Sequence, residues 1–220
     1  MSKSVSIAIL ISGQGSNLQA IIDQVALEQL DVDIRVVVSN RPAVAGLLRA
    51  QSAGIPTEVV DHTVYPSREA FDRALLTVLS RYDVEWVILA GFMRRLTAEC
   101  VAAYKGKMLN VHPALLPKHR GLHTHERVLA CGDRWHGTSI HCVTAALDAG
   151  PLICQGRFAV EPSDTVATLT QKVQQLEHYL YPEVLKFVAC RQLVCADDKV
   201  VLNGHKIPSE GLDLTPDFIK

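Results

Sequence analysis

The chain has 220 residues, of which 48% are hydrophobic and 20% charged, and its formal net charge is −1 at pH 7. This length allows one sizeable α/β domain, or at most two small ones, and the composition is ordinary for a globular domain. The near-zero charge gives no electrostatic argument for nucleic acid or an anionic membrane as a partner. No apolar run approaches the ~18 residues of a membrane-spanning helix.

The first half of the chain alternates apolar runs with helical patterns. The apolar runs predict four strands, at residues 5–11, 33–39, 57–61 and 85–91. Helical spacing predicts three helices between them, which begin near Ser16, near Pro42 and after Ser67, a residue type that favours the N-cap position. Such alternation favours a mostly parallel, twisted sheet with helices on both faces, and we expect a single-domain Rossmann-like α/β fold.

The second half contains fewer clear patterns. Residues 138–144 alternate like a half-exposed strand, and a long amphipathic helix should run from about 164 to 189, disturbed at Pro182. Residues 208–220 show no periodicity. We therefore expect one domain over residues 1–207 and a loosely held C-terminal tail over residues 208–220.

Cysteine usage bears on the cellular compartment. No C-x-x-C spacing occurs and no signal peptide precedes the first strand, so we expect a cytoplasmic protein with reduced, mostly buried thiols. The six cysteines are Cys100, Cys131, Cys142, Cys154, Cys190 and Cys195.

A glycine-rich loop, “GQGSN” at residues 13–17, separates the first strand from the first helix. Backbone N–H groups at such a turn have no intrahelical partner and can bind an anion. The dinucleotide fingerprint is incomplete, because Leu18 replaces its third glycine and the second strand ends without an acidic residue. A single phosphate on a small substrate fits better. A tight turn that binds nothing remains the alternative.

Asn110 and His112 lie two residues apart, where an apolar run ends before Pro113. In a strand their side chains would point to the same side, at the edge where α/β sheets bind ligands. An amide and an imidazole can together stabilise an oxyanion. Asp148, in the loop “LDAGP”, could keep the imidazole protonated. The alternative is a metal site, with candidate ligands His112, His119, His123 and His125.

Several segments between about residue 5 and residue 205 resemble the phosphoribosylglycinamide formyltransferase family. They include “ILISGQGSNLQAII”, “SREAFDRAL”, “VILAGFMRRL”, “LNVHPALLPKHRGLHTHERVLACGDRWHGTSIHCVTAALDAGPLI” and “QLEHYLYP”. The order N-x-H-P, L-L-P-x-x-x-G and L-D-x-G-P indicates the folate-dependent formyltransferase superfamily. G-x-G-S-N and G-L-H-T-H narrow the resemblance to this family.

The resemblance implies direct transfer of a formyl group from 10-formyltetrahydrofolate to the amine of phosphoribosylglycinamide in purine biosynthesis, without a metal. It implies that Asn110 and His112 stabilise the oxyanion, and that His112 helps to protonate the departing folate nitrogen. Asp148 would hold His112 in its charged form and assist proton transfer through water.

The resemblance also assigns binding residues. The ribonucleotide would contact Gly15, Ser16, Asn17, Gln174 and Glu177. The folate would contact Arg68, Met93, Arg94, Arg95, Leu96 and Asn110. Only small-molecule partners are implied, and the chain would be a monomer or a homodimer. Arg95 and Cys100 depart from the residues usual in the pteridine pocket, and His119-Arg120 departs from an expected tyrosine-proline pair.

Four other functions compete with this interpretation. Methionyl-tRNA formyltransferase would need a second domain and a basic surface, and formyltetrahydrofolate deformylase would carry an N-terminal regulatory domain. A non-catalytic nucleotide-binding module and a histidine-based metal hydrolase belong to different classes. The histidine cluster lacks a paired acidic ligand at helical spacing, which argues against the hydrolase.

Overall fold

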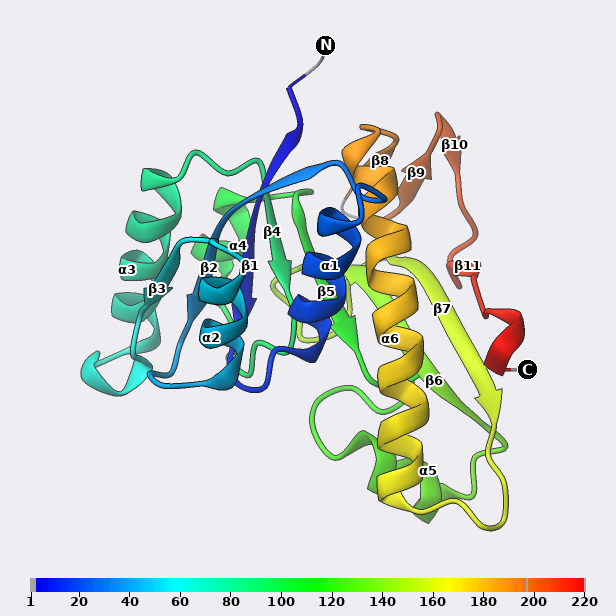
Figure 1. The fold of residues 1–220 in the computed structure, drawn as a ribbon. Coiled ribbons are helices and arrows are strands. Elements are labelled where there is room, and N and C mark those ends of the chain that lie inside the picture. The colour runs from blue at the N-terminus through cyan, green and yellow to red at the C-terminus, as the bar shows by residue number, and fades with distance from the viewer. Residues whose placement is uncertain (1–2, 197, 220) are drawn as a thin grey trace. The chain divides into compact units, whose positions relative to one another are not determined.

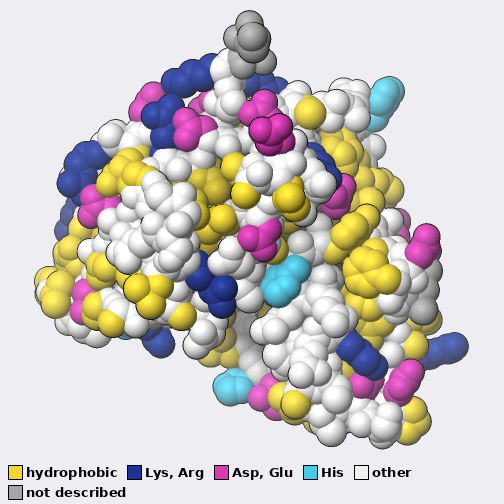
Figure 2. Space-filling model, in the orientation of Figure 1, with side chains coloured by type: hydrophobic (Ala, Val, Ile, Leu, Met, Phe, Trp, Pro, Cys, Tyr) yellow, Lys and Arg dark blue, Asp and Glu magenta, His cyan; other side chains and the backbone are white. Residues whose placement is uncertain are grey.

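The computed structural model describes residues 3–196 and 198–219. The described residues form two compact units, which divide between Asn110 and Val111. Among the described residues, no helix combines the length and hydropathy that a bilayer span requires. On the face drawn in Figure 2, acidic and basic side chains are interspersed, which agrees with the small net charge.

The first unit contains parallel strands in the order β5-β4-β1-β2-β3, with β1 at the centre (Figure 1). Every residue of β1 is buried, because the strand is paired on both sides and is apolar. This is the predicted Rossmann order, and the four expected strands are confirmed. The strands are β1 (Val5–Ile11), β2 (Val32–Ser39), β3 (Thr57–Val59), β4 (Trp86–Leu89) and β5 (Met108–His112).

Four helices and one short 3-10 helix connect these strands. Connections between parallel strands are right-handed, so α1 and α2 cover one face of the sheet and α3 and α4 the other. The Ser67 hydroxyl accepts the Ala70 N–H at 3.1 Å, which confirms the predicted N-cap of α3. The helices are α1 (Ser16–Ala26), α2 (Ala45–Ser52), η1 (His62–Val64), α3 (Arg68–Arg81) and α4 (Ala98–Ala103).

The strand order reverses between β1 and β4. From β1 the chain continues to β2 and then β3 on one side of β1, whereas β4 and β5 lie on its other side. The loops that follow β1 and β4 meet there, because the Met93 N–H donates to the Ser12 hydroxyl at 2.7 Å. Ligands of open α/β sheets bind at such a switch point, beyond the carboxyl ends of the strands.

The second unit has an antiparallel pair, β6 with β7, and a small antiparallel sheet in the order β10-β9-β8. Helix α6 packs against β6 and β7. A Cβ at Gly156 would lie 2.7 Å from Leu180 Cδ1, so glycine lets the leucine side chains of α6 pack close to β7. The elements are α5 (Thr124–Cys131), β6 (Trp135–Cys142), β7 (Leu152–Ala159), α6 (Val166–Ala189), β8 (Leu193–Cys195), β9 (Val200–Leu202), β10 (His205–Lys206), β11 (Leu212–Asp213) and η2 (Asp217–Ile219).

Three expectations for this unit differ from the structure. Strand β6 is buried from residue 136 to 142 rather than half-exposed, because its alternating polar residues have hydrogen-bond partners inside the unit. Helix α6 continues through Pro182. The tail is not loose where β11 pairs parallel with β7, and the Leu214 N–H extends this pairing to the Gln155 carbonyl at 2.9 Å.

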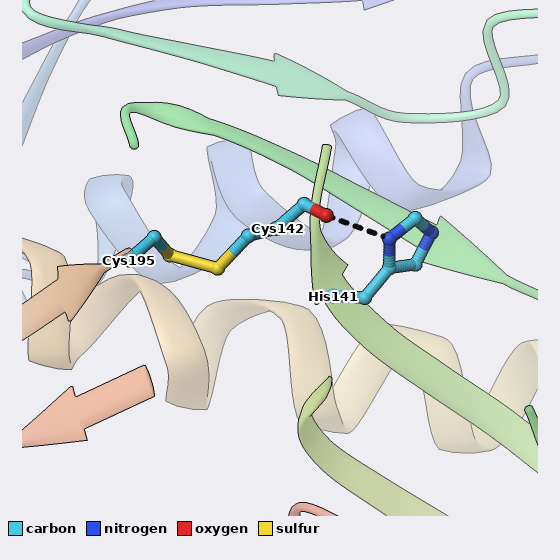
Figure 3. The surroundings of a disulfide bond; sticks show 3 residues. All are labelled: His141, Cys142 and Cys195. Atoms are coloured by element: carbon cyan, nitrogen blue, oxygen red, sulfur yellow. Dashed lines mark hydrogen bonds between the residues drawn. A yellow bond between two sulfur atoms is a disulfide. The ribbon is translucent and has the colours of Figure 1, made fainter. Parts of the chain in front are cut away.

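The expectation that all thiols are reduced was wrong. Cys142 at the end of β6 and Cys195 at the end of β8 form a disulfide, with their Cα atoms 6.2 Å apart (Figure 3). Their separation of 53 residues concealed this proximity in the sequence. The remaining cysteines are free; Cys100 and Cys154 are buried, and Cys131 and Cys190 are exposed.

Candidate active site

His112 is the last residue of β5, and its side chain is almost completely buried. Its Nδ1 lies 3.4 Å from Asp148 Oδ2, and its Nε2 donates to the His119 carbonyl at 2.9 Å. The Thr138 hydroxyl donates to the His112 carbonyl at 2.9 Å and so fixes the backbone. Because both ring nitrogens face acceptors, a protonated imidazole here can donate in both directions.

Asp148 lies in the loop between β6 and β7, in a left-handed backbone conformation with φ of 45°. Its Oδ2 accepts the Gly121 N–H at 2.9 Å, which joins this loop to the loop that follows β5. A second histidine, His141, has its Nε2 3.9 Å from Asp148 Oδ1. Burial lowers the pKa of His141 and favours its neutral form. His112 is therefore the histidine that can form an ion pair with the Asp148 carboxylate.

The Asp148 loop is anchored at Cys142. The Nδ1 of His141 donates to the Cys142 carbonyl at 3.0 Å (Figure 3), and the Cys142 N–H donates to the Pro151 carbonyl at 3.0 Å. A Cβ at Gly150 would lie 1.8 Å from the Cys142 carbonyl oxygen, so only glycine fits there. The glycine and proline of the “LDAGP” motif therefore serve to close this loop tightly behind Asp148.

Two polar residues that the sequence did not single out hold the loop after His112. The Ser139 hydroxyl accepts the Leu116 N–H at 3.0 Å and donates to the Ala114 carbonyl at 2.7 Å. The side-chain amide of Gln155 donates to the Leu116 carbonyl at 2.9 Å. Their location on neighbouring strands β6 and β7 makes them contacts of tertiary structure, and a sequence pattern contains no signal for them.

Asn110 precedes His112 by two residues on β5 and is half-buried. The side chain of Val111, between them, is buried. Because successive side chains of a strand alternate, Asn110 and His112 share one face of β5, as the sequence predicted.

The glycine loop leads into α1 without a side-chain cap. Gly15 has φ of 69° and is the N-cap of α1, where no side chain caps the helix. A Cβ at Gly15 would lie 2.7 Å from the Cα of Gly46, at the start of α2. The amides that begin α1 thus lie at the switch point, where the helix dipole favours a negative charge. Arg49, which the sequence did not single out, supports the loop by donating to the Gln14 carbonyl at 2.9 Å.

The predicted folate residues lie in the first unit, on α3 and in the loop after β4. Arg68 is the first residue of α3 and is exposed. Within the segment 93–96, Met93 is 61% exposed while Leu96 is buried. An exposed methionine beside the switch point is a suitable surface for a flat apolar ring.

Neighbouring residues limit how this segment can move. The Arg94 guanidinium stacks on Phe71, 4.5 Å from the ring centroid, and Arg95 is exposed. Cys100 is fully buried, and this burial raises the pKa of its thiol to about 12. Cys100 is therefore an inert packing residue.

The remaining predicted ribonucleotide residues, Gln174 and Glu177, lie on α6 in the second unit. Their spacing of three residues places them on the same side of the helix. Gln174 is exposed and Glu177 is buried. Burial, with a smaller contribution from the Glu177 charge, raises the pKa of Tyr181 well above its usual value.

The candidate metal ligands have separate partners. His119 Nε2 contacts Asp133 Oδ2 at 2.6 Å, and the exposed His123 lies 3.6 Å from Glu126. His125 Nδ1 contacts His136 Nε2 at 2.8 Å. Within residues 3–196 and 198–219, no three His, Cys, Asp or Glu side chains are grouped so that they could hold a metal ion.

The chain is similar to known proteins over nearly its whole length. A phosphoribosylglycinamide formyltransferase of Escherichia coli (strain K12) is 44% identical over 207 residues, which are 94% of this chain and 98% of that protein. The human trifunctional purine biosynthetic protein adenosine-3 is 45% identical over 187 residues, but the match covers only 18% of its length.

Solved structures and a family model extend the comparison. The phosphoribosylglycinamide formyltransferase of Coxiella burnetii, solved in complex with CHES, has a TM-score of 0.91 and 46% identity, over 97% of this chain and 100% of the other. The predicted α/β fold class is thereby confirmed. A family model described as formyl transferase matches residues 5–185. The chain therefore belongs to the formyl transferase family.

Proposed function

We propose that this chain transfers the formyl group of 10-formyltetrahydrofolate to the amine of phosphoribosylglycinamide. The products would be phosphoribosyl-N-formylglycinamide and tetrahydrofolate, in de novo purine biosynthesis. The observation that carries the proposal is the buried His112, which lies between the Asp148 carboxylate and the His119 carbonyl. Relatives that bear the name phosphoribosylglycinamide formyltransferase, at 44% and 46% identity, support phosphoribosylglycinamide as the formyl acceptor.

The chemistry would be direct attack of the amine on the formyl carbon. As the new C–N bond forms, the carbonyl electrons move to oxygen and give a tetrahedral adduct with an oxyanion. The Asn110 amide and the protonated His112 would donate hydrogen bonds to that oxygen, and for this the Nε2–H of His112 would exchange the His119 carbonyl for the substrate oxygen. The adduct then collapses, the bond from carbon to the folate nitrogen breaks, and its electron pair returns to that nitrogen.

The proton balance of this step assigns a role to Asp148. The attacking amine must lose a proton, and the departing folate nitrogen must gain one. Before the transfer, the Asp148 carboxylate would keep His112 charged. His112 would then donate its proton to the folate nitrogen, and the proton of the amine would pass through a water molecule to Asp148. Transfer of that proton from Asp148 to the neutral His112 would restore both groups. Because His141 is neutral, it does not compete with His112 for the carboxylate.

Binding would use the two groups of residues described above. The backbone amides of Gly15, Ser16 and Asn17 would hold the phosphate, and Gln174 and Glu177 the remainder of the ribonucleotide. Folate would contact Arg68 and the segment Met93–Leu96, and Asn110 would contact its formyl group. The phosphate loop and the segment Met93–Leu96 both follow strands that meet at the switch point between β1 and β4, where open α/β sheets bind ligands.

Formyl transfer followed by folate absorbance tests the proposal directly. The assay compares phosphoribosylglycinamide as acceptor with water alone. We expect turnover only with the ribonucleotide. The His112→Ala variant should retain at most about 1% of the turnover rate of the unaltered chain. Turnover without an acceptor would instead identify a deformylase, and no turnover in either case would refute the proposal.

Several expectations remain predictions. They are a monomer or a homodimer, a cytoplasmic location, and a domain that extends over residues 1–207. The absence of a metal requirement is also a prediction and is tested below by chelation.

A further inference from the structure

A pocket of about 310 Å³ lies in the second unit, behind the loop that follows His112. Its volume is at the lower end of the range for small-molecule sites. Residues from that loop, from the first part of β6 and from β7 line it, and the proposed function uses none of their side chains. The six that matter for its chemistry are Lys118, His119, Arg134, Trp135, His136 and Arg157.

The wall of the pocket is an exposed indole surrounded by guanidinium groups. Trp135 is 44% exposed, which is unusual for so large an apolar side chain. The guanidinium carbons of Arg134 and Arg157 lie 5.8 Å and 5.4 Å from the centroid of its ring. Stacked indole and guanidinium planes are a surface on which a further planar ring can stack.

The pocket also has an excess of positive charge. Asp133 is its acidic lining residue, and this carboxylate already has two partners, Lys118 at 2.9 Å and His119 at 2.6 Å. Arg157 contacts Asp213 at 3.2 Å, in a pair whose side chains are both more than half exposed. Such an exposed pair is weak and can open to receive another anion.

His136 also lines the pocket and is fully buried, but its ring belongs to the opposite face of β6 from Trp135. It is paired with Phe158, packs against the Phe158 ring and contacts His125 through its Nε2. The indole and the two guanidinium groups, rather than His136, therefore carry the argument for a ligand.

We propose that this pocket binds a small aromatic anion, a planar ring that carries a phosphate or a carboxylate. The ring stacks on Trp135 or on the adjacent guanidinium groups, and the anionic group contacts Arg134 and Arg157. The occupant would also touch His119, whose backbone carbonyl accepts the Nε2–H of His112. The pocket is therefore one residue removed from the candidate catalytic histidine.

The experiment uses adenosine 5′-monophosphate as the probe, because it joins a planar ring to a phosphate. Adenosine and inorganic phosphate serve as half-probes that each lack one feature. The chain has two tryptophans, so the Trp86→Phe variant leaves Trp135 as the only indole fluorophore. We expect saturable quenching of Trp135 by the nucleotide, and at least about tenfold weaker binding of either half-probe. Calorimetric titration of the unaltered chain repeats the measurement without the Trp86 substitution.

Matched variants separate this pocket from the glycine loop. Arg134→Gln and Arg157→Gln should each weaken binding about tenfold, as expected for one lost charged hydrogen bond. Asp213→Asn breaks the same ion pair as Arg157→Gln but keeps the cation, so it should bind the nucleotide at least as tightly. Gly15→Val should leave the quenching of Trp135 unchanged.

Three results would overturn the proposal. The first is the absence of saturable quenching at millimolar nucleotide. The second is equal weakening by Asp213→Asn and Arg157→Gln, which would mean that the ion pair matters rather than the guanidinium. The third is loss of quenching in Gly15→Val, which would place the nucleotide at the glycine loop. None of these measurements depends on formyl transfer, so they stand apart from the test of the proposed function.

Discussion

Replacing Asp148 with asparagine should remove the charge beside His112 while preserving the shape of the loop. The two groups lie 3.4 Å apart, and their side chains are only 5% and 10% exposed, so solvent screens them little. At an effective dielectric constant of about 20, opposite unit charges at this distance attract by about 5 kcal/mol. The net effect is smaller, because the protonated ring also donates to the His119 carbonyl. We expect kcat at neutral pH to fall by at least tenfold.

The pH dependence gives this prediction a sign. Without the carboxylate, the charged form of His112 loses the anion that lies 3.4 Å from its Nδ1. The loss of activity in Asp148→Asn should therefore be smallest in the acidic range and grow as the pH rises. Steady-state kcat measured across the pH range, in both proteins, tests this. The control is Glu126→Gln, which alters an exposed carboxylate 3.6 Å from His123 and should leave kcat unchanged.

A double-mutant cycle tests whether the two residues act as one unit. His112→Ala alone should lower kcat by about 100-fold or more, the usual cost of one lost oxyanion donor, with smaller changes in KM. The double variant His112→Ala/Asp148→Asn should be little worse, because the aspartate would have lost its partner. Fully additive losses would mean that Asp148 acts independently of His112, and the proposed mechanism would be wrong.

Three further predictions concern the phosphate loop, the buried histidine pair and metals. Gly15→Val should raise the KM for the ribonucleotide far more than the KM for folate. The control Gly13→Ala, whose Cβ would have no neighbour within 4 Å, should change neither KM. Equal effects of Gly15→Val on both KM values would refute the assignment of the phosphate site. Burial, and secondarily the nearby His125, lowers the pKa of His136 to about 4, so as the pH falls the unfolded state takes up a proton at this residue before the folded state does. The free energy of unfolding, measured by urea denaturation, should therefore be highest above pH ~6.5 and fall by about 3 kcal/mol toward pH ~4. It should depend less on pH in the His136→Gln variant. Exhaustive chelation should leave formyl transfer intact; a loss of activity that added zinc or iron restores would revive the histidine-metal site.

Periodicity alone predicted strands β1 to β4 and helices α1 to α3 of the first unit, but it did not predict η1 or α4. Strands β1 to β4 are short apolar runs, and the cap of α3 is a serine followed by helical spacing, so both depend on residues that are neighbours in the sequence. The spacing of Asn110 and His112 is likewise local, because a strand alternates its side chains wherever it lies. The need for glycine at position 15 follows from the turn at the start of α1.

Tertiary structure decided which distant residues meet. The meeting of Asp148 with His112, the support of the intervening loop by Ser139 and Gln155, and the disulfide between Cys142 and Cys195 all join segments far apart in sequence. The burial of β6 and the pairing of β11 with β7 also differed from expectation, since each depends on a neighbouring strand or helix. Local patterns record propensity and amphipathicity, whereas these contacts arise only when packing brings complementary polar groups together out of water.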